Sequence, residues 1–195
     1  MDSINDPEKE QLVKNISELQ AKYYETNKKN NFFKSGQKTE CAKQVIQNMD
    51  IEKLIQHSFF LIPNTNNIFF DYPLFKTYAC AEVYEQFATH SYSVLYSCLA
   101  VNATFEMHVN MNSFTISAFE RLRKLIERFF IESPLFSDKL TYVYVYYTPS
   151  IIDHINTIIK MFISHISYKI VYFSKTESEN KMSMLFSRDY KGHDK

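Results

Sequence analysis

The fold is decided by residues 102–174, which read NATFEMHVNMNSFTISAFERLRKLIERFFIESPLFSDKLTYVYVYYTPSIIDHINTIIKMFISHISYKIVYFS. Three strand patterns, at 104–111, 140–147 and 168–173, alternate here with two helix patterns. Where short loops join a strand to a helix and that helix to the next strand, the helix forms a crossover connection between two parallel strands. This order therefore predicts an α/β fold with a mainly parallel sheet and right-handed crossover helices.

The first two strand patterns differ in character. In 104–111 the apolar side chains fall at odd-numbered positions and the polar ones at even-numbered positions, which is typical of a strand with two different faces. Residues 140–147 are almost wholly Val and Tyr, as expected for a strand covered on both faces. Tyr142, Tyr144 and Tyr146 project to one side of the sheet, where they line an amphipathic ligand pocket or are buried by covering helices.

Each predicted helix has a start signal. Ser117 with Glu120 three residues later forms a capping box. That helix should end before Pro134, because the residue preceding a proline disfavours helical geometry. Thr148 followed by Pro149 predicts the N-terminus of the second helix.

Helix and strand patterns also precede this region. Residues 7–27 carry an apolar stripe at helical steps, and 40–57 carry a second helical pattern that Asp50 divides. These helices are expected to pack on the domain or on a partner. Residues 68–72 predict a short or edge strand, and 74–99 predict a helix. The predicted organisation is an N-terminal helical extension at 1–58, an α/β domain at 59–174 and a polar C-terminal tail at 175–195.

Composition excludes several classes of function. The 195 residues are 45% hydrophobic, which is enough for one sizeable core. The 22 basic and 22 acidic residues leave no net field to attract nucleic acid. Two glycines are too few for a phosphate-cradling loop. The polar N-terminus and three cysteines without CxxC spacing predict a reducing compartment, and the apolar runs are too short to span a bilayer.

Candidate reactive residues are few, and we expect no metal, no cofactor and no enzyme activity. The histidines and cysteines lack metal-ligand spacing. His108 and Glu106 share one strand face, either as an acid–base pair or as a partly solvated polar face. Ser113, Thr115 and Ser117 follow the end of a parallel strand, where open α/β sheets place ligands. Turn chemistry and helix capping are the alternative explanation for these three.

The same residues resemble the central half of the CRAL-TRIO lipid-exchange domain. The resemblance is carried by 105–111, the turn 112–116, the helix opening 117–121, the corner region 140–149 and the Lys-Ile strand 169–171. Tyr147-Thr148-Pro149 stands at the family's Asn-x-Pro-like corner. Within this family, the sequence resembles uncharacterised members from large nucleocytoplasmic DNA viruses. Little chain follows the Lys-Ile strand, so the resemblance implies a truncated domain without the gate helix.

The resemblance and the lost gate lead to two functional hypotheses. The first is a non-enzymatic module of a large DNA virus that acts by protein–protein contacts, as a virion-associated or minor capsid component, in the virion or the host cytoplasm. The alternative is a lipid-binding or lipid-transfer protein that holds a hydrophobic ligand between the sheet and the segment 74–99. Neither nucleic acid nor a transmembrane segment is expected. The candidate ligand-binding residues are Ser113, Thr115, Tyr142, Tyr144 and Tyr146.

Overall fold

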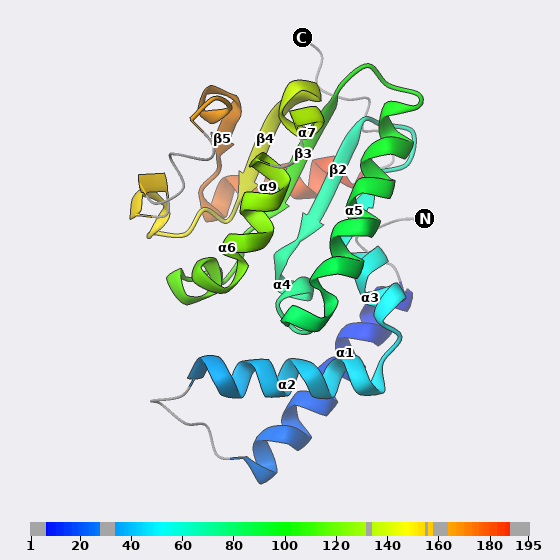
Figure 1. The fold of residues 1–195 in the computed structure, drawn as a ribbon, viewed down its shortest axis with the longest axis vertical. Coiled ribbons are helices and arrows are strands. Elements are labelled where there is room, and N and C mark those ends of the chain that lie inside the picture. Colours follow the sequence, from blue (N-terminus) through cyan, green and yellow to red (C-terminus); the bar gives the residue numbers. More distant parts are fainter. Residues whose placement is uncertain (1–6, 28–33, 132–133, 155, 158–163, 188–195) are drawn as a thin grey trace.

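The computed structural model describes residues 7–27, 34–131, 134–154, 156–157 and 164–187 and has an α/β architecture (Figure 1). Its strands are β1 Phe59–Leu61, β2 Asn67–Asp71, β3 Phe105–Asn110, β4 Leu140–Tyr146 and β5 Ile170–Tyr172. Its α-helices are α1 Pro7–Thr26, α2 Lys34–Asn48, α3 Ile51–Ser58, α4 Tyr72–Phe75, α5 Tyr84–Leu99, α6 Ile116–Ile131, α7 Pro134–Lys139 and α9 Lys175–Leu185. Turns of 3-10 helix cover Ala81–Val83 and Ser167–Lys169.

The strands of the described residues form one five-stranded sheet in the order β1-β2-β3-β4-β5. β1 is antiparallel to β2, whereas β2, β3, β4 and β5 run parallel. The prediction of a mainly parallel α/β sheet is therefore confirmed. The segment expected as a short or edge strand is β2, which lies inside the sheet because the three-residue strand β1 pairs with its outer side.

The helices form two layers around the sheet. α5 and α6 lie on one face, and α9, drawn in red, lies on the other (Figure 1). Neighbouring parallel strands follow each other in chain order, and α5 and α6 connect them on the same face. Successive crossovers of one hand produce this arrangement, because each returns over the same side of the sheet.

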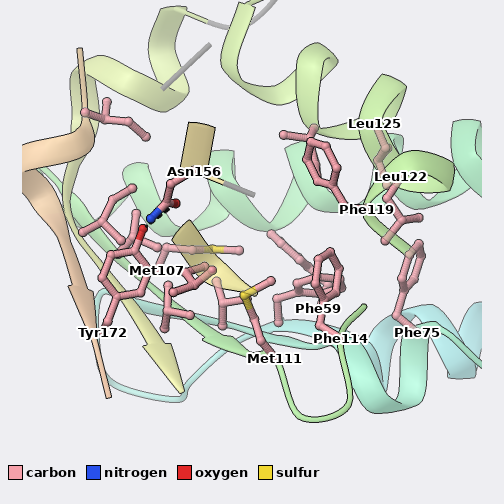
Figure 2. A pocket seen from close by; sticks show the side chains of 18 of the residues that line it. Phe59, Phe75, Met107, Met111, Phe114, Phe119, Leu122, Leu125, Asn156 and Tyr172 are labelled. Atoms are coloured by element: carbon pink, nitrogen blue, oxygen red, sulfur yellow. Dashed lines mark hydrogen bonds between the residues drawn. The ribbon is translucent and has the colours of Figure 1, made fainter. Parts of the chain in front are cut away.

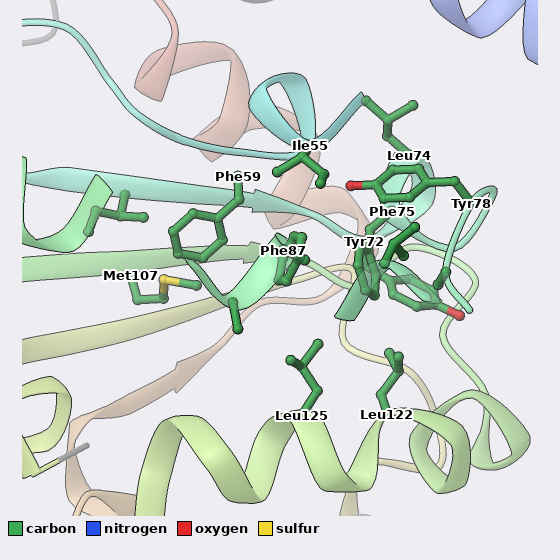
Figure 3. Packing of buried hydrophobic residues seen from close by; sticks show 14 of the residues in the cluster. Ile55, Phe59, Tyr72, Leu74, Phe75, Tyr78, Phe87, Met107, Leu122 and Leu125 are labelled. Carbon is green, nitrogen blue, oxygen red and sulfur yellow. The ribbon is translucent and has the colours of Figure 1, made fainter. Parts of the chain in front are cut away.

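The main core lies between the sheet and the layer of α5 and α6. Leu122 and Leu125 of α6 point from the helix toward the sheet (Figure 3). Aromatic rings lie across the core from these leucines, and the ring centroids of Phe75 and Phe87 are 4.4 Å apart and those of Phe59 and Phe87 are 5.8 Å apart. Such ring pairs add directional contacts to the burial of apolar area.

A smaller apolar cluster lies on the opposite face, beneath α9. It contains Phe69, Tyr144 and Tyr146 from the sheet and Leu185 from α9. Residues 175–185, which the sequence analysis placed in a polar tail, thus form a helix that covers the second face. The helix begins at a capping box, in which the Ser174 hydroxyl accepts from a backbone N–H of the first turn.

The N-terminal helices pack on the α/β domain. Leu12 and Ile16 of α1 are buried in the main core together with Val45 of α2. Asp50 separates α2 from α3, as predicted, and its carboxylate accepts hydrogen bonds from the first turn of α3. Of the two placements expected for these helices, the structure shows the one on the domain.

Both predicted helix starts in 102–174 are wrong in position. α6 begins at Ile116, and Thr115 rather than Ser117 caps it, since the Ala118 N–H lies 3.3 Å from the Thr115 hydroxyl. Thr148 does not cap a helix at Pro149. Its hydroxyl donates to the carbonyl of Val145 at 3.3 Å, and the following helical turn starts at Ile152. In both places a turn takes up the residues just after the strand.

Candidate functional site

An apolar cavity lies between the sheet and the helical layer formed by α5, α6 and the turn that begins at Ile152 (Figure 2). On the sheet side, the cavity is lined by the side chains that point away from α9, namely Phe59, Phe70, Met107, Val109, Val143, Val145, Ile170 and Tyr172. The helices and connections cover it with Phe75, Phe87, Met111, Phe114, Phe119, Leu122, Leu125, Ile126, Phe136, Ile152, Asn156 and Ile166. Alternation along each strand is the reason that these sheet residues share one face.

The cavity volume is about 200 Å³. Pockets for drug-sized ligands begin near about 300 Å³, whereas an apolar cavity of about 150 Å³ is large enough to bind benzene. The space therefore suits a molecule smaller than a typical drug. It is also the place where the sequence analysis located a hydrophobic ligand, next to the segment 74–99.

The polar side chains of the described lining are Asn156 and Tyr172. The Tyr172 hydroxyl donates to Asn156 Oδ1 at 2.9 Å, and the two side chains point toward each other in Figure 2. Burial raises the pKa of the Tyr172 phenol, and the charge of Asp153 raises it further. The phenol is therefore a neutral donor and acceptor at physiological pH.

On the face of the sheet beneath α9, buried polar side chains contact one another. His108 is fully buried, and its Nδ1 lies 2.8 Å from the Tyr146 hydroxyl. Its Nε2 lies 3.9 Å from Glu106 Oε2, so the predicted pair of strand neighbours does come together. The His108 ring stacks on Tyr144 with a centroid distance of 4.9 Å. The described lining of the apolar cavity does not include His108.

The three candidate tyrosines of β4 lie on this second face, away from the apolar cavity. Tyr144 and Tyr146 are buried beneath α9, and Tyr142 is 43% exposed. The described lining of the apolar cavity contains none of them. Of the two interpretations left open for this series, burial by a covering helix is the one observed for Tyr144 and Tyr146.

Ser113 and Thr115 have local structural roles. Ser113 adopts a φ of 61°, in the left-handed region, and accepts a hydrogen bond from Lys76 Nζ at 2.5 Å. Burial lowers the pKa of that lysine. Thr115 caps α6. Both residues lie at the carboxyl end of β3, as predicted, and outside the described lining of the apolar cavity.

Lys169 and Tyr147, which belong to the segments that carry the CRAL-TRIO resemblance, connect neighbouring elements. Lys169 donates to the carbonyls of Ser137 at 3.1 Å and Leu140 at 2.6 Å, which places a cation at the C-terminus of α7. Tyr147, at the corner after β4, has a φ of 52°. Its backbone N–H donates to the Ser178 hydroxyl at 2.6 Å and so ties the corner to α9.

An open groove of about 690 Å³ runs between α1 and α9 at the carboxyl ends of β2 and β3. Two of its charged side chains form an ion pair: Lys9 Nζ lies 2.6 Å from Asp71 Oδ2, and Asn110 Nδ2 donates to Asp71 Oδ1 at 3.3 Å. The carboxyl ends of parallel strands are the usual ligand position in open α/β sheets. Here the ion pair fastens α1 across that edge.

Other chemistries find little support in the described part of the chain. It contains no cluster of three His, Cys, Asp or Glu side chains that could hold a metal ion. Cys41, Cys80 and Cys98 are buried and unpaired in disulfides, and burial raises the pKa of each thiol. A raised pKa keeps a thiol protonated and unreactive. None of the described helices is long and apolar enough to cross a membrane.

No protein-family model, no curated protein and no solved structure matches this chain. The chemistry of the site therefore rests on its own residues. Sequence analysis named the region of the cavity but missed Asn156 and Tyr172. The two lie on different elements, 16 positions apart, and no local pattern signals their contact.

Proposed function

We propose that this chain binds a small hydrophobic ligand in the cavity between its sheet and the layer of α5 and α6. The observation that carries the proposal is a volume of about 200 Å³ whose described lining is apolar except for Asn156 and Tyr172. A space of this kind is poorly hydrated, so filling it with an apolar molecule is favourable. The cavity's place agrees with what the CRAL-TRIO resemblance implies, and we propose the chain as a divergent relative of that family.

Size limits what the ligand can be. A phospholipid with two acyl chains is far larger than a cavity below the range of drug-sized pockets. We therefore propose a binding or carrier protein for a compact hydrophobic molecule rather than an exchanger of whole phospholipids. No reaction step is part of this proposal, because the described lining supplies no ionised group that could act on the ligand.

Native mass spectrometry of gently purified protein tests the proposal. We expect a mass above the 23.1 kDa of the chain by that of one small apolar molecule, which organic solvent then extracts. Val143→Phe projects a ring into the cavity and should remove the adduct. Val101→Phe is the matched control, because Val101 is 81% exposed.

A clean apo mass for the folded wild-type protein would overturn the proposal. It would favour the other hypothesis, a virion-associated component that acts through protein contacts. Retention of the adduct in folded Val143→Phe would show that the bound molecule lies outside the cavity. Circular dichroism confirms in each case that the variant is folded.

A further inference from the structure

A serine and a lysine meet at the carboxyl edge of the sheet, outside the described lining of the apolar cavity. Lys76 directly follows α4, just after the end of β2, and Ser113 lies in the turn between β3 and α6. Because β2 and β3 are parallel neighbours, both residues lie at the same edge, where Lys76 Nζ is 2.5 Å from Ser113 Oγ. Open α/β sheets usually bind their ligands at this edge.

The turn after β3 holds Ser113 in the geometry of an exposed nucleophile. Its φ of 61° lies in the left-handed region, which costs a residue with a Cβ about 1–2 kcal/mol. A serine at a strained turn between a strand and a helix is the arrangement by which many hydrolases present a nucleophilic hydroxyl. Met111 and Thr115 stand where glycines usually flank such a serine, so the likeness is one of geometry. Ser113 is exposed, and a substrate can reach its Oγ.

The surroundings of Lys76 favour its neutral form. Burial lowers the pKa of its ammonium group, and the positive charge of Lys38 on α2 lowers it further, whereas the charge of Asp71 opposes the shift. The ring of Tyr72, whose centroid lies 5.9 Å from Nζ, also attracts the charged form, but only weakly at that distance. A lowered pKa increases the neutral fraction of a lysine, and only the neutral amine can accept a proton.

The hydroxyl proton of Ser113 can pass directly to this amine. In the structure the hydroxyl donates to the carbonyl of Asn112 at 2.5 Å and accepts from Lys76 Nζ. Once Nζ has lost a proton it becomes an acceptor, and the hydroxyl, which rotates freely about its C–O bond, can donate to it instead. Nucleophile and base are then within hydrogen-bond reach of each other, as general-base catalysis requires.

The geometry points to a serine–lysine catalytic pair in which Ser113 Oγ attacks a carboxylic ester and Lys76 Nζ takes up the hydroxyl proton. Oγ forms a bond to the carbonyl carbon, the bond from that carbon to the alcohol oxygen breaks, and Lys76 returns the proton to the leaving oxygen. Water then cleaves the acyl-serine through the same proton transfers and releases the carboxylic acid. An ester is the substrate class assigned, because its alcohol leaves more readily than the amine of an amide. The pair is independent of the proposed ligand cavity.

Labelling of the full chain with a fluorophosphonate tests the pair, because an activated serine displaces fluoride from phosphorus. Peptide mass spectrometry should find the label on Ser113, and Ser113→Ala should abolish it. Ser183→Ala, at an exposed serine of α9, is the matched control and should label as the wild type does. Lys76→Arg keeps the cation and a donor for Ser113 but cannot accept a proton, so it should slow labelling by about 100-fold or more.

Two further measurements separate catalysis from a structural tie. The labelling rate of the wild type should rise with pH, with a midpoint below the ordinary lysine value of 10.5. This profile uses the unaltered protein, so it remains a test if a variant fails to fold. The wild type should also hydrolyse p-nitrophenyl acetate, and folded Ser113→Ala and Lys76→Arg should lose that turnover.

The contrary results are equally definite. A wild-type protein that is not labelled at Ser113 would overturn the assignment. Equal labelling rates in the wild type and in folded Lys76→Arg would remove the lysine as the base, and so would a midpoint at or above 10.5. Labelling of Ser113 without any ester turnover would overturn the assignment as a hydrolase.

Discussion

His108 Nδ1 lies 2.8 Å from the hydroxyl of Tyr146, and both side chains are buried on the face of the sheet that α9 covers. The contact links β3 to β4 through side chains, in addition to the backbone ladder that pairs His108 with Tyr144. A buried polar group is stabilising only while its partners are in place, because water cannot replace them.

Tyr146→Phe should therefore destabilise the protein by about 1–3 kcal/mol, the cost of removing one partner of a buried polar group. Tyr142→Phe on the same strand is the matched control, because Tyr142 is 43% exposed. Urea unfolding of both variants measures the difference. Equal stability of the two variants would show that the buried contact contributes nothing.

The turn after β3 makes a second prediction, at Ser113. Its φ of 61° lies in the left-handed region, which glycine adopts without the steric cost that a Cβ imposes. Ser113→Gly and Ser113→Ala both lose the hydroxyl that accepts from Lys76, so their comparison isolates the backbone. We expect the glycine variant to be more stable by about 1 kcal/mol in thermal unfolding. A more stable alanine variant would contradict the positive φ.

The capping box of α9 predicts a local effect on the second face. Ser174→Ala should cost about 1 kcal/mol and raise hydrogen exchange across α9, because the first turn of the helix loses its side-chain cap. Ser183→Ala, in the exposed interior of the same helix, is the control and should leave exchange unchanged. Unaltered protection of α9 in Ser174→Ala would refute the cap's role.

The same box carries a pH dependence through Glu177. Hydrogen bonds from Ser174 lower the pKa of this carboxyl below its ordinary 4.5. The contribution of the ionised Glu177 side chain to stability is therefore present above pH 4.5. It is lost as the pH falls through the lowered pKa of the folded state. Glu177→Gln should abolish this part of the acid sensitivity of α9 exchange. Identical acid profiles for the wild type and Glu177→Gln would contradict the prediction.

Tyr78 predicts a change in stability at alkaline pH. Its side chain is fully buried, and its hydroxyl bonds to Ser58 and, at 3.4 Å, to the carbonyl of Leu54. Burial, opposed by the Ser58 bond, raises the phenol pKa well above its ordinary 10.0. As the pH rises, the unfolded chain therefore loses the Tyr78 proton before the folded protein does. The contribution of the neutral phenol to stability is complete below its ordinary pKa of 10.0 and is lost as the pH rises above that value.

Unfolding of the wild type and of Tyr78→Phe near pH 7, near pH 9 and at about pH 10.5 measures this linkage. The stability difference between the two proteins should be constant at the lower two values and should shift in favour of the phenylalanine variant at the highest. A difference that stays constant throughout would mean that the phenol titrates normally in the folded protein.

The sequence predicted the central elements because each has a strong local signal. The alternation in 104–111 and the Val-Tyr run of 140–147 correspond to β3 and β4, and the apolar face of α6 is buried at Ala118 and Leu122. The crossover rule then determined that the strands run parallel. These features depend on periodicity and connection length, both of which are local properties of the chain.

The missed features depend on tertiary contacts. β1 has three residues and exists because it pairs with β2. α9 is polar over most of its surface, and its helical state depends on the Ser174 cap and on docking of Leu185 against the tyrosine face of β4. The Asn156–Tyr172 pair needs a helical turn and an edge strand to come together. None of these has a periodic signature in the sequence.

The most direct test of the apolar cavity is a crystal of the ligand-free protein pressurised with xenon, which enters dry apolar cavities of this size. The account predicts an anomalous scattering peak between the sheet and α6, within contact of Met107 and Val143. Val143→Phe should lose that peak. A well-ordered wild-type crystal with no xenon between these layers would contradict the cavity and, with it, the proposed ligand.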